Sequence, residues 1–235
     1  MRIVINHLTR MQRSFVCVAG LEPKTRQHVR PVMRRRLSTD FLLQKGGPFE
    51  MAHEVDIGAV EKIGSPPEIE DHSFDHRHAL SVRTLKPLDF WNLLRQASQP
   101  QLSDIFGAEL SATGFACSVP AGHGKASLGC MVPVGRPTLF LNARPDRADQ
   151  IRMRFSDGVL QVDAAVTDIR LFGADHVTPD LAVLKQVNER IQAGIGVILS
   201  VGLGRPFTPS PEIAPQHWLQ VNNIHLEDNP IWPLG

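Results

Sequence analysis

The chain contains no tyrosine, and aromatic residues make up only 6% of its 235 residues. A platform on which many nucleic-acid bases stack in succession needs a row of aromatic side chains. The composition therefore excludes an extended platform of that kind. Any site for bases must use few aromatics, and the candidates are Trp218, Phe15, Phe155 and Phe207.

Cysteine is also scarce, and Cys17, Cys117 and Cys130 are widely spaced, with no CxxC pair. Disulfide frameworks and zinc ribbons need cysteines in pairs. We therefore expect three reduced thiols in the core, no metal and no cofactor. The segment 71–78 contains three histidines and two aspartates, but its spacing matches no closed zinc pattern. We interpret it as a solvated acidic loop, with a metal site as the alternative.

Several sequence signals that would define a class of protein are missing. No run of about 18 apolar residues is present, which argues against a membrane span. The N-terminus lacks the apolar run and cleavage site of a secretory signal, so we expect a cytoplasmic protein with no membrane partner. No P-loop, dinucleotide-binding fingerprint, HExxH motif or pair of catalytic carboxylates is found. These absences favour a binding protein over an enzyme, and no catalytic residue is assigned.

Charge is unevenly distributed, although the net charge is only +1. Residues 1–36 contain nine basic residues and one acidic residue, whereas residues 50–75 contain eight acidic residues and one lysine. The two blocks can neutralise each other across the folded surface. Alternatively, the basic block forms a face for a polyanion, where phosphate contacts supply salt-dependent affinity. The residues expected to bind phosphate are Arg10, Arg30, Arg34, Arg35, Arg36 and Arg205.

Hydrophobic periodicity predicts a mainly β protein with a few helices. In the first half, strands are expected near residues 2–8, 14–20, 27–33 and 54–63, followed by an amphipathic helix over 87–97. After Gly107 the composition shifts toward Gly, Ala and Ser. We therefore divide the chain into residues 1–107, an N-terminal OB-like barrel with a helical extension, and 108–235, a C-terminal OB-like barrel with one inserted helix.

The second half offers strands near 127–133, 138–142, 151–155, 159–162, 165–172, 197–203 and 218–226. Asp157 and Gly158 suit a hairpin turn. Thr178 followed by Pro179 predicts the start of a helix, with the threonine hydroxyl as its cap. A proline-rich loop over 206–215 separates the last two strands.

The segment 196–206 is rich in glycine and includes Ser200. Ser200 lies in neither a GxSxG nor an SxxK motif, so a serine nucleophile is disfavoured. Gly202 and Gly204 either allow close approach of a ligand, with Arg205 binding its phosphate, or mark a bend in the strand.

The last strand carries an unusual stripe of polar side chains. Strict alternation places Trp218, Gln220, Asn222 and Ile224 on one face and Leu219 and Val221 on the core face. Trp218, Gln220 and Asn222 are the candidates for stacking a base and bonding its edge. In the alternative interpretation, Trp218 packs under the proline-rich loop. Four polar residues embedded in apolar runs form a possible further site: His7, Asp168, Arg170 and His225.

Motifs spread along nearly the whole chain resemble those of bacterial dual OB-containing domain proteins. The matching stretches are 5–11 (INHLTRM), 17–20 (CVAG), 28–31 (HVRP), 127–130 (SLGC), 166–171 (VTDIRL), 199–203 (LSVGL), 205–207 (RPF) and 217–221 (HWLQV). The resemblance implies two tandem OB barrels and a role in binding nucleic acid or nucleotides. OB barrels generally bind oligonucleotides on one sheet face and its loops.

Three hypotheses follow from the sequence. The leading one is a non-catalytic module that binds single-stranded RNA or DNA, or a nucleotide. The second is an enzyme acting on a nucleotide or phosphoester, with His7, Asp168 or His225 as acid or base groups, which requires these residues to converge at a pocket. The third is a scaffold for a protein partner, which requires an exposed apolar patch.

Overall fold

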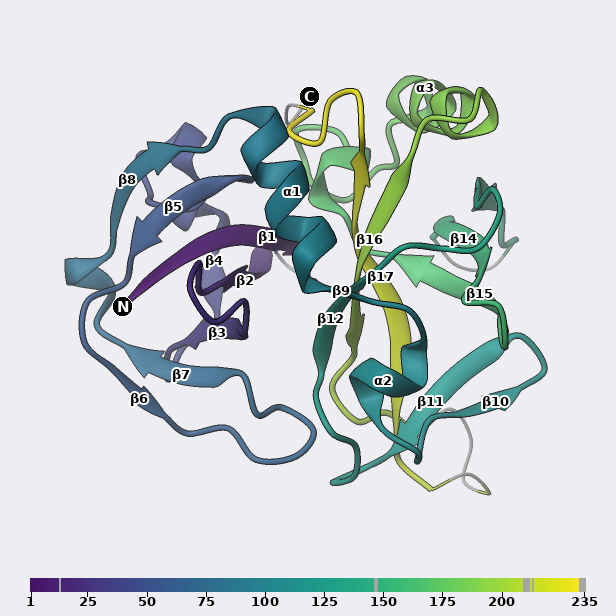
Figure 1. Ribbon diagram of the computed structural model, residues 1–235, viewed down its shortest axis with the longest axis horizontal. Helices are drawn as coiled ribbons and strands as arrows, with labels where there is room; N and C mark the ends of the chain where they lie inside the picture. The colour runs from purple at the N-terminus through teal and green to yellow at the C-terminus, as the bar shows by residue number, and fades with distance from the viewer. Residues whose placement is uncertain (13, 146–147, 209–211, 213, 233–235) are drawn as a thin grey trace.

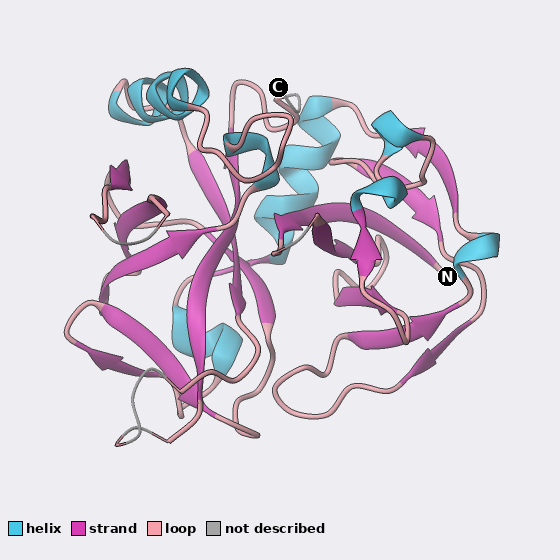
Figure 2. Ribbon diagram, turned by 180° about the vertical axis from the view of Figure 1, so that it is seen from behind, coloured by secondary structure: helices cyan, strands magenta, loops and turns pink. Residues whose placement is uncertain are grey.

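The chain folds into two curled, mainly antiparallel sheets that lie side by side (Figure 1). The computed structural model describes every residue except 13, 146–147, 209–211, 213 and 233–235. Arg13 of the basic block and part of the proline-rich loop thus lie outside the described residues. The N-terminal part of the chain forms the first sheet and the C-terminal part forms the second, and the view from behind shows the same division (Figure 2).

The first sheet is built around a strand that is buried on both faces. That strand, β1 (Arg2–Arg10), is buried from Ile3 to Thr9, with one face on the first core and the other toward the second sheet. The order of the sheet is β6 (Val60–Lys62), β7 (Asp71–Phe74), β3 (His28–Val32), β2 (Phe15–Leu21), β1, β5 (His53–Asp56) and β8 (Leu80–Thr84), and β4 (Leu37–Ser38) pairs with β2. Three short 3-10 helices complete this half: η1 (Thr39–Phe41), η2 (Leu43–Lys45) and η3 (His76–His78).

The second sheet is built around the long last strand, β17 (Gln216–Leu226). One edge of β17 pairs with β16 (Val197–Leu203), and the other pairs with β11 (Ala116–Pro120) and β15 (Gln161–Val166). The order of the sheet is β13 (Thr138–Asn142), β14 (Gln150–Ser156), β15, β17, β16, β12 (Leu128–Met131) and β9 (Ser98–Gln99). In addition, β10 (Ser111–Thr113) pairs with β11, and η4 (Ile169–Leu171) follows β15.

Helix α1 (Pro87–Ala97) lies where the two sheets meet (Figure 1). Its apolar side chains Phe90, Trp91 and Leu94 join the first core, which also takes in Cys130 and Ile198 from the second sheet. The first core therefore crosses the junction between the sheets. Helices α2 (Leu102–Phe106) and α3 (Leu181–Gln192) pack on the second core.

The chain passes from one sheet to the other directly after α1. Strand β9 already pairs in parallel with β12 of the second sheet. The side chains of Leu102, Ile105 and Phe106 belong to the second core. Residues 98–106 therefore pack with the second half of the structure, although they precede the change in composition at Gly107.

The predicted mainly β class is confirmed, as are helix 87–97 and strand 197–203. The hairpin turn is also confirmed, because β14 and β15 pair across it and Gly158 adopts a φ of 92°. The helix predicted to start at Thr178 begins later, because the side chain of Asp180 accepts hydrogen bonds from the N–H groups of Ala182 and Val183.

Two strand predictions and one loop prediction were wrong in part. The predicted strand 54–63 is two strands, interrupted at Gly58, which has a φ of 70°. The predicted strand 165–172 ends at Val166, because the Asp168 carboxylate accepts from the N–H of Arg170 and starts η4. The segment 71–78 is not a solvated loop throughout, since residues 71–74 form β7, which pairs with both β3 and β6.

The two sheets are joined at a free edge of β1. Beyond Val4, this edge has no pairing with β5, so the backbone groups of Leu8 need other partners. The side chain of Asn223 on β17 supplies both: its Oδ1 accepts from the Leu8 N–H at 2.8 Å, and its Nδ2 donates to the Leu8 carbonyl at 3.1 Å. Two residues further along, the N–H of Arg10 donates to the Thr167 carbonyl at 2.9 Å. One amide thus replaces a neighbouring strand.

We predict that Asn223→Ala strongly destabilises the protein. The substitution leaves two buried backbone groups of Leu8 without partners, at about 1–3 kcal/mol each. The expected loss in the free energy of unfolding, measured by urea denaturation, is therefore about 2–6 kcal/mol. Asn142→Ala, at an exposed position of β13, serves as the control and should change stability by less than about 0.5 kcal/mol. Equal stability of the two variants would contradict the role given to Asn223.

Candidate functional site

A cleft of about 830 Å³ opens between the two sheets. The first half contributes the turn between β2 and β3, together with Lys62, Ile69, Glu70 and His72. The second half contributes residues around β9 and α2, together with the segment 125–129 that leads into β12. This volume lies within the range of about 300–1,000 Å³ that is usual for small-molecule and cofactor sites.

Five lysine and arginine side chains line the cleft. Arg2 is paired with Glu54 and Asp56. The other four are Lys24, Arg26, Lys62 and Lys125. Arg26 donates to the side-chain oxygen of Gln96 at 3.1 Å, and Lys125 donates to the backbone carbonyl of Asp104 at 2.9 Å. Across the described part of the chain, none of the four forms an ion pair with a carboxylate. Their positive charge is therefore directed to the cleft and to solvent.

Three acidic residues of the cleft wall, Glu22, Glu70 and Asp104, are engaged within the protein. The Asp104 carboxylate accepts from the N–H of Gln101 at 3.2 Å. The Glu70 carboxylate is buried and accepts hydrogen bonds from the N–H and hydroxyl of Ser127 and from the N–H of Leu128, at 2.8–3.1 Å. Burial raises the pKa of Glu70. Glu22 accepts from the N–H of Thr25. Glu70 thus ties the first sheet to the second and leaves the basic groups to set the character of the cleft.

Behind one wall of the cleft lies a cluster of buried polar side chains. His28 lines the cleft, and His7 and Cys130 lie behind it, almost completely buried. The rings of His7 and His28 meet edge to face, with centroids 4.9 Å apart. One ring nitrogen of each histidine and the Cys130 Sγ lie within 4.8 Å of one another. Three residues from three strands therefore present metal-binding atoms to a single point.

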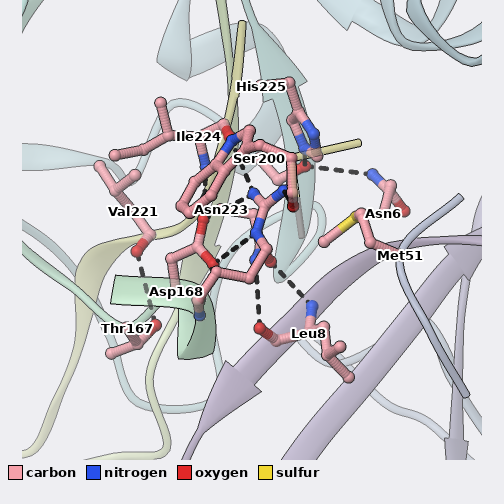
Figure 3. A network of polar contacts seen from close by, with 12 residues as sticks. Asn6, Leu8, Met51, Thr167, Asp168, Ser200, Val221, Asn223, Ile224 and His225 are labelled. Carbon is pink, nitrogen blue, oxygen red and sulfur yellow. Dashed lines mark hydrogen bonds and ion pairs between the residues drawn. The ribbon is translucent and has the colours of Figure 1, made fainter. Parts of the chain in front are cut away.

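The side chains of Asn6, Ser200 and Asn222 surround these residues. The Asn6 Nδ2 lies 3.2 Å from each of the His28 Nε2, the Cys130 Sγ and the Ser200 Oγ. Ser200 also lies 2.9 Å from the Nε2 of His225 (Figure 3). Asn222 lies 3.1 Å from the Nδ1 of His7. The cluster is thus one continuous network across the junction.

Burial keeps these groups neutral. It lowers the pKa of His28 to about 4, and it lowers the pKa of His7 and of His225 well below the ordinary value of 6.5. Neighbouring histidines add to the effect on His7. Burial raises the pKa of the Cys130 thiol to about 12. At neutral pH the cluster therefore consists of uncharged imidazoles and a thiol.

Asp168 and Arg170, two of the predicted polar residues, do not join this cluster. They form a buried ion pair, with a distance of 2.7 Å between the Arg170 Nη2 and the Asp168 Oδ2. Asp168 also accepts from the N–H of Ile224, and Arg170 donates to the Ile224 carbonyl (Figure 3). The Arg170 guanidinium stacks on the Trp232 ring, 3.8 Å from its centroid. The pair joins the chain after β15 to β17. Neither His7 nor His225 lines the cleft, so the three proposed acid and base groups do not meet in it.

The six arginines proposed from the sequence lie at separate places. Arg30 and Arg205 meet at the Asp71 carboxylate, and Arg205 also pairs with Glu68. Arg10 stacks on Phe172 with its Cζ 4.3 Å from the ring centroid. Arg34, Arg35 and Arg36 are exposed, and Arg36 lies over Phe15. The acidic block thus neutralises Arg30 and Arg205, and none of the six lines the cleft.

The polar stripe of the last strand is interrupted by a bulge. Val201 pairs with Val221 and Ser200 pairs with Asn223, so Asn222 is the extra residue of β17. After it, Ile224 and Leu226 face the second core, instead of the face predicted for Ile224, while Asn223 and His225 face the first sheet. Leu219 and Val221 face the core, as expected. Trp218 and Gln220 are partly buried, and the Trp218 Nε1 donates to the Phe207 carbonyl.

The glycines of β16 make room for this stripe. A Cβ on Gly202 would lie 2.4 Å from the Asn222 amide nitrogen, and a Cβ on Gly204 would lie 2.8 Å from that of Gln220. The two glycines therefore accommodate side chains of the neighbouring strand. Both interpretations of the segment made from sequence, a ligand contact and a simple bend, overlooked this packing.

Sequence patterns did not predict that His28, Cys130 and Asn6 lie together. They also did not predict that three lysines and one arginine, Lys24, Lys62, Lys125 and Arg26, share one cleft. His28 and Cys130 are 102 positions apart and His7 precedes His28 by 21, so no local spacing connects them. The only signal was compositional: Asn6, His7 and His28 are polar residues within runs that otherwise form strands.

The two curled sheets are those of a dual OB-like β fold. The model of the dual OB-containing domain family matches residues 1–224, and the chain belongs to that family. No curated protein matches the chain. Among the described residues, no helix is both long enough and apolar enough to span a bilayer.

We predict that the protein loses stability as the pH falls below about 6.5. The unfolded chain then binds protons on His7, His28 and His225, whereas the folded chain does so only at much lower pH. One pKa unit corresponds to about 1.4 kcal/mol, so His28 alone lowers the free energy of unfolding by up to about 3 kcal/mol between pH 6.5 and 4.

Urea denaturation across this range, in the presence of a chelator, measures the effect. His28→Gln should flatten the profile, because a titratable imidazole is removed from the unfolded state. His123→Gln, at an exposed position, is the control. A wild-type profile that stays level between pH 6.5 and 4 would contradict the prediction.

Proposed function

We propose that this protein binds single-stranded nucleic acid or a nucleotide in the cleft between its two barrels. The observation that carries the proposal is the set of four basic side chains on the cleft, Lys24, Arg26, Lys62 and Lys125, none of which forms an ion pair with a carboxylate among the described residues. Unpaired cations around a concave site favour a phosphate-bearing ligand. OB barrels in general bind oligonucleotides, which agrees with the family.

The cleft offers the two kinds of contact that a nucleotide needs. Ile105, Leu128, Val29 and Ile69 contribute apolar surface on which a base or sugar can lie. Arg26 adds a planar guanidinium that stacks on bases, and its fork of donors suits phosphate. His28 adds a polar group at the wall. No phenylalanine or tryptophan lines the cleft, which agrees with a ligand of one or two bases rather than a long stacked strand.

The arginine surface is the rival location for the same function. Arg34, Arg35 and Arg36 are exposed and carry no ion pair within the described chain, so they also attract polyanions. Trp218 and Gln220 lie on β17, next to the pair formed by Arg205 and Asp71. The carboxylates of Glu68 and Asp71 reduce the attraction for phosphate near Trp218. Arg34, Arg35 and Arg36 do not line the cleft, and a concave site favours a small ligand, so we place the ligand in the cleft.

The experiment measures fluorescence anisotropy of labelled single-stranded RNA and DNA at several salt concentrations. If four cations contact phosphates, the slope of log affinity against log salt is about −3. Lys24→Glu combined with Lys62→Glu should weaken binding by at least about 10-fold and make the slope shallower. Arg34→Glu combined with Arg35→Glu changes the net charge equally and is the matched control, expected to weaken binding by less than about 3-fold.

The outcomes separate the hypotheses. A larger loss in the arginine variant than in the lysine variant would move the site to the arginine surface. Absence of binding by the wild type at low salt, or binding insensitive to salt, would contradict the function itself. Competition by an unlabelled mononucleotide shows whether one nucleotide is sufficient.

A further inference from the structure

We infer that His7, His28 and Cys130 form a zinc-binding site behind the wall of the cleft. The inference is independent of the proposed function, because it concerns atoms that the barrels bring together whatever occupies the cleft. It rests on the arrangement of the three ligand atoms and on buried polar atoms that lack partners.

The spacing of the ligand atoms suits one metal ion. The Cys130 Sγ and the His28 Nε2 are 3.8 Å apart, and a nitrogen of His7 lies within 4.8 Å of both. Two ligands at about 2.3 Å (sulfur) and about 2.0–2.1 Å (nitrogen) from a tetrahedral zinc ion are about 3.6 Å apart. Small side-chain rotations therefore bring the three atoms into zinc coordination.

The acceptor atoms around Asn6 outnumber the hydrogens that its amide can donate to them. The Asn6 amide nitrogen has two hydrogens but faces three acceptors at 3.2 Å, the His28 Nε2, the Cys130 Sγ and the Ser200 Oγ. In addition, the buried Nε2 of His7 and the buried Oδ1 of Asn6 have no hydrogen-bond partner within the described residues. Burial of unpartnered polar atoms costs free energy, and a cation at this point would offset that cost.

The ligand types favour zinc over other common ions. Imidazole nitrogen and thiolate sulfur bind zinc well, whereas magnesium and calcium require oxygen ligands. The Asn222 amide nitrogen lies 3.1 Å from the Nδ1 of His7. With zinc on the Nε2 of His7, the Nδ1 carries a proton, and the Asn222 amide, turned so that its oxygen faces the ring, accepts it and orients the imidazole. Three protein ligands leave a fourth position open, as in catalytic zinc sites. Because His28 lines the cleft, a water molecule or ligand can reach that position from the cleft.

The test uses the full chain, stripped of metal with a chelator and then titrated with Zn²⁺ and, separately, Co²⁺. Expected are one bound ion per chain and, with Co²⁺, a charge-transfer band from thiolate to metal. Cys130→Ser should abolish that band and weaken zinc binding by at least about 10-fold. Loss of a residue that only hydrogen-bonds to a metal ligand already weakens binding by about 10-fold or more. Cys117→Ser is the matched control, since Cys117 is equally buried but lies in the second core, and it should retain the band.

His28→Gln provides a second variant if Cys130→Ser fails to fold by circular dichroism. It should retain the fold, because His28 is only partly buried, and it should weaken zinc binding to a similar extent. The inference is overturned if wild-type protein binds no ion at equimolar zinc, or if the cobalt band is equally strong in Cys130→Ser. The two proposals can fail separately. Metal-free protein that still binds nucleic acid would support the proposed function, whereas the zinc titration alone decides whether the metal site exists.

Discussion

The structure depends on how the second barrel completes the unpaired edge of β1. A buried strand edge cannot leave its N–H and carbonyl groups without partners, because there is no water to replace them. Asn223 and the Thr167 carbonyl supply those partners from the second half. The Asp168 and Arg170 pair then fixes β17 against the chain after β15. This polar junction, the apolar core that crosses it and the Glu70 contacts with Ser127 and Leu128 together hold the two barrels beside the cleft.

Two β-bulges place the polar cluster at this junction. The register of β1 against β2 shifts between Ile5 and His7, so Asn6 is the extra residue there, and Asn222 is the extra residue of β17. Bulges re-aim side chains and are common next to functional sites. Here they direct Asn6 and His7 from one strand, and Asn222 and Asn223 from another, toward the same region. An ion behind the cleft wall would use groups that these two irregularities position.

Much of the fold was predictable because its signals are local. The periodicity of residues 87–97, the apolar run 197–203 and the turn at Asp157 and Gly158 each determine one element from neighbouring residues. The candidate site was not predictable in the same way. A bulge cannot be read from an alternating pattern, and one extra residue at Asn222 reversed the faces expected for Ile224. The pairing of Arg30 and Arg205 with Asp71 likewise depends on β3 and β7 becoming neighbours. Arg30 and Asp71 are 41 positions apart in the sequence, so no local pattern connects them.

The central claim is that the cleft between the barrels is the place where the ligand binds. Hydrogen–deuterium exchange of the full chain, with and without a saturating single-stranded oligonucleotide, tests it directly. The account predicts slower exchange in the turn at residues 22–29 and in the segments 62–72, 97–105 and 125–129, which line the cleft. Slower exchange confined to residues 33–37 and 216–222, with the cleft segments unchanged, would contradict it.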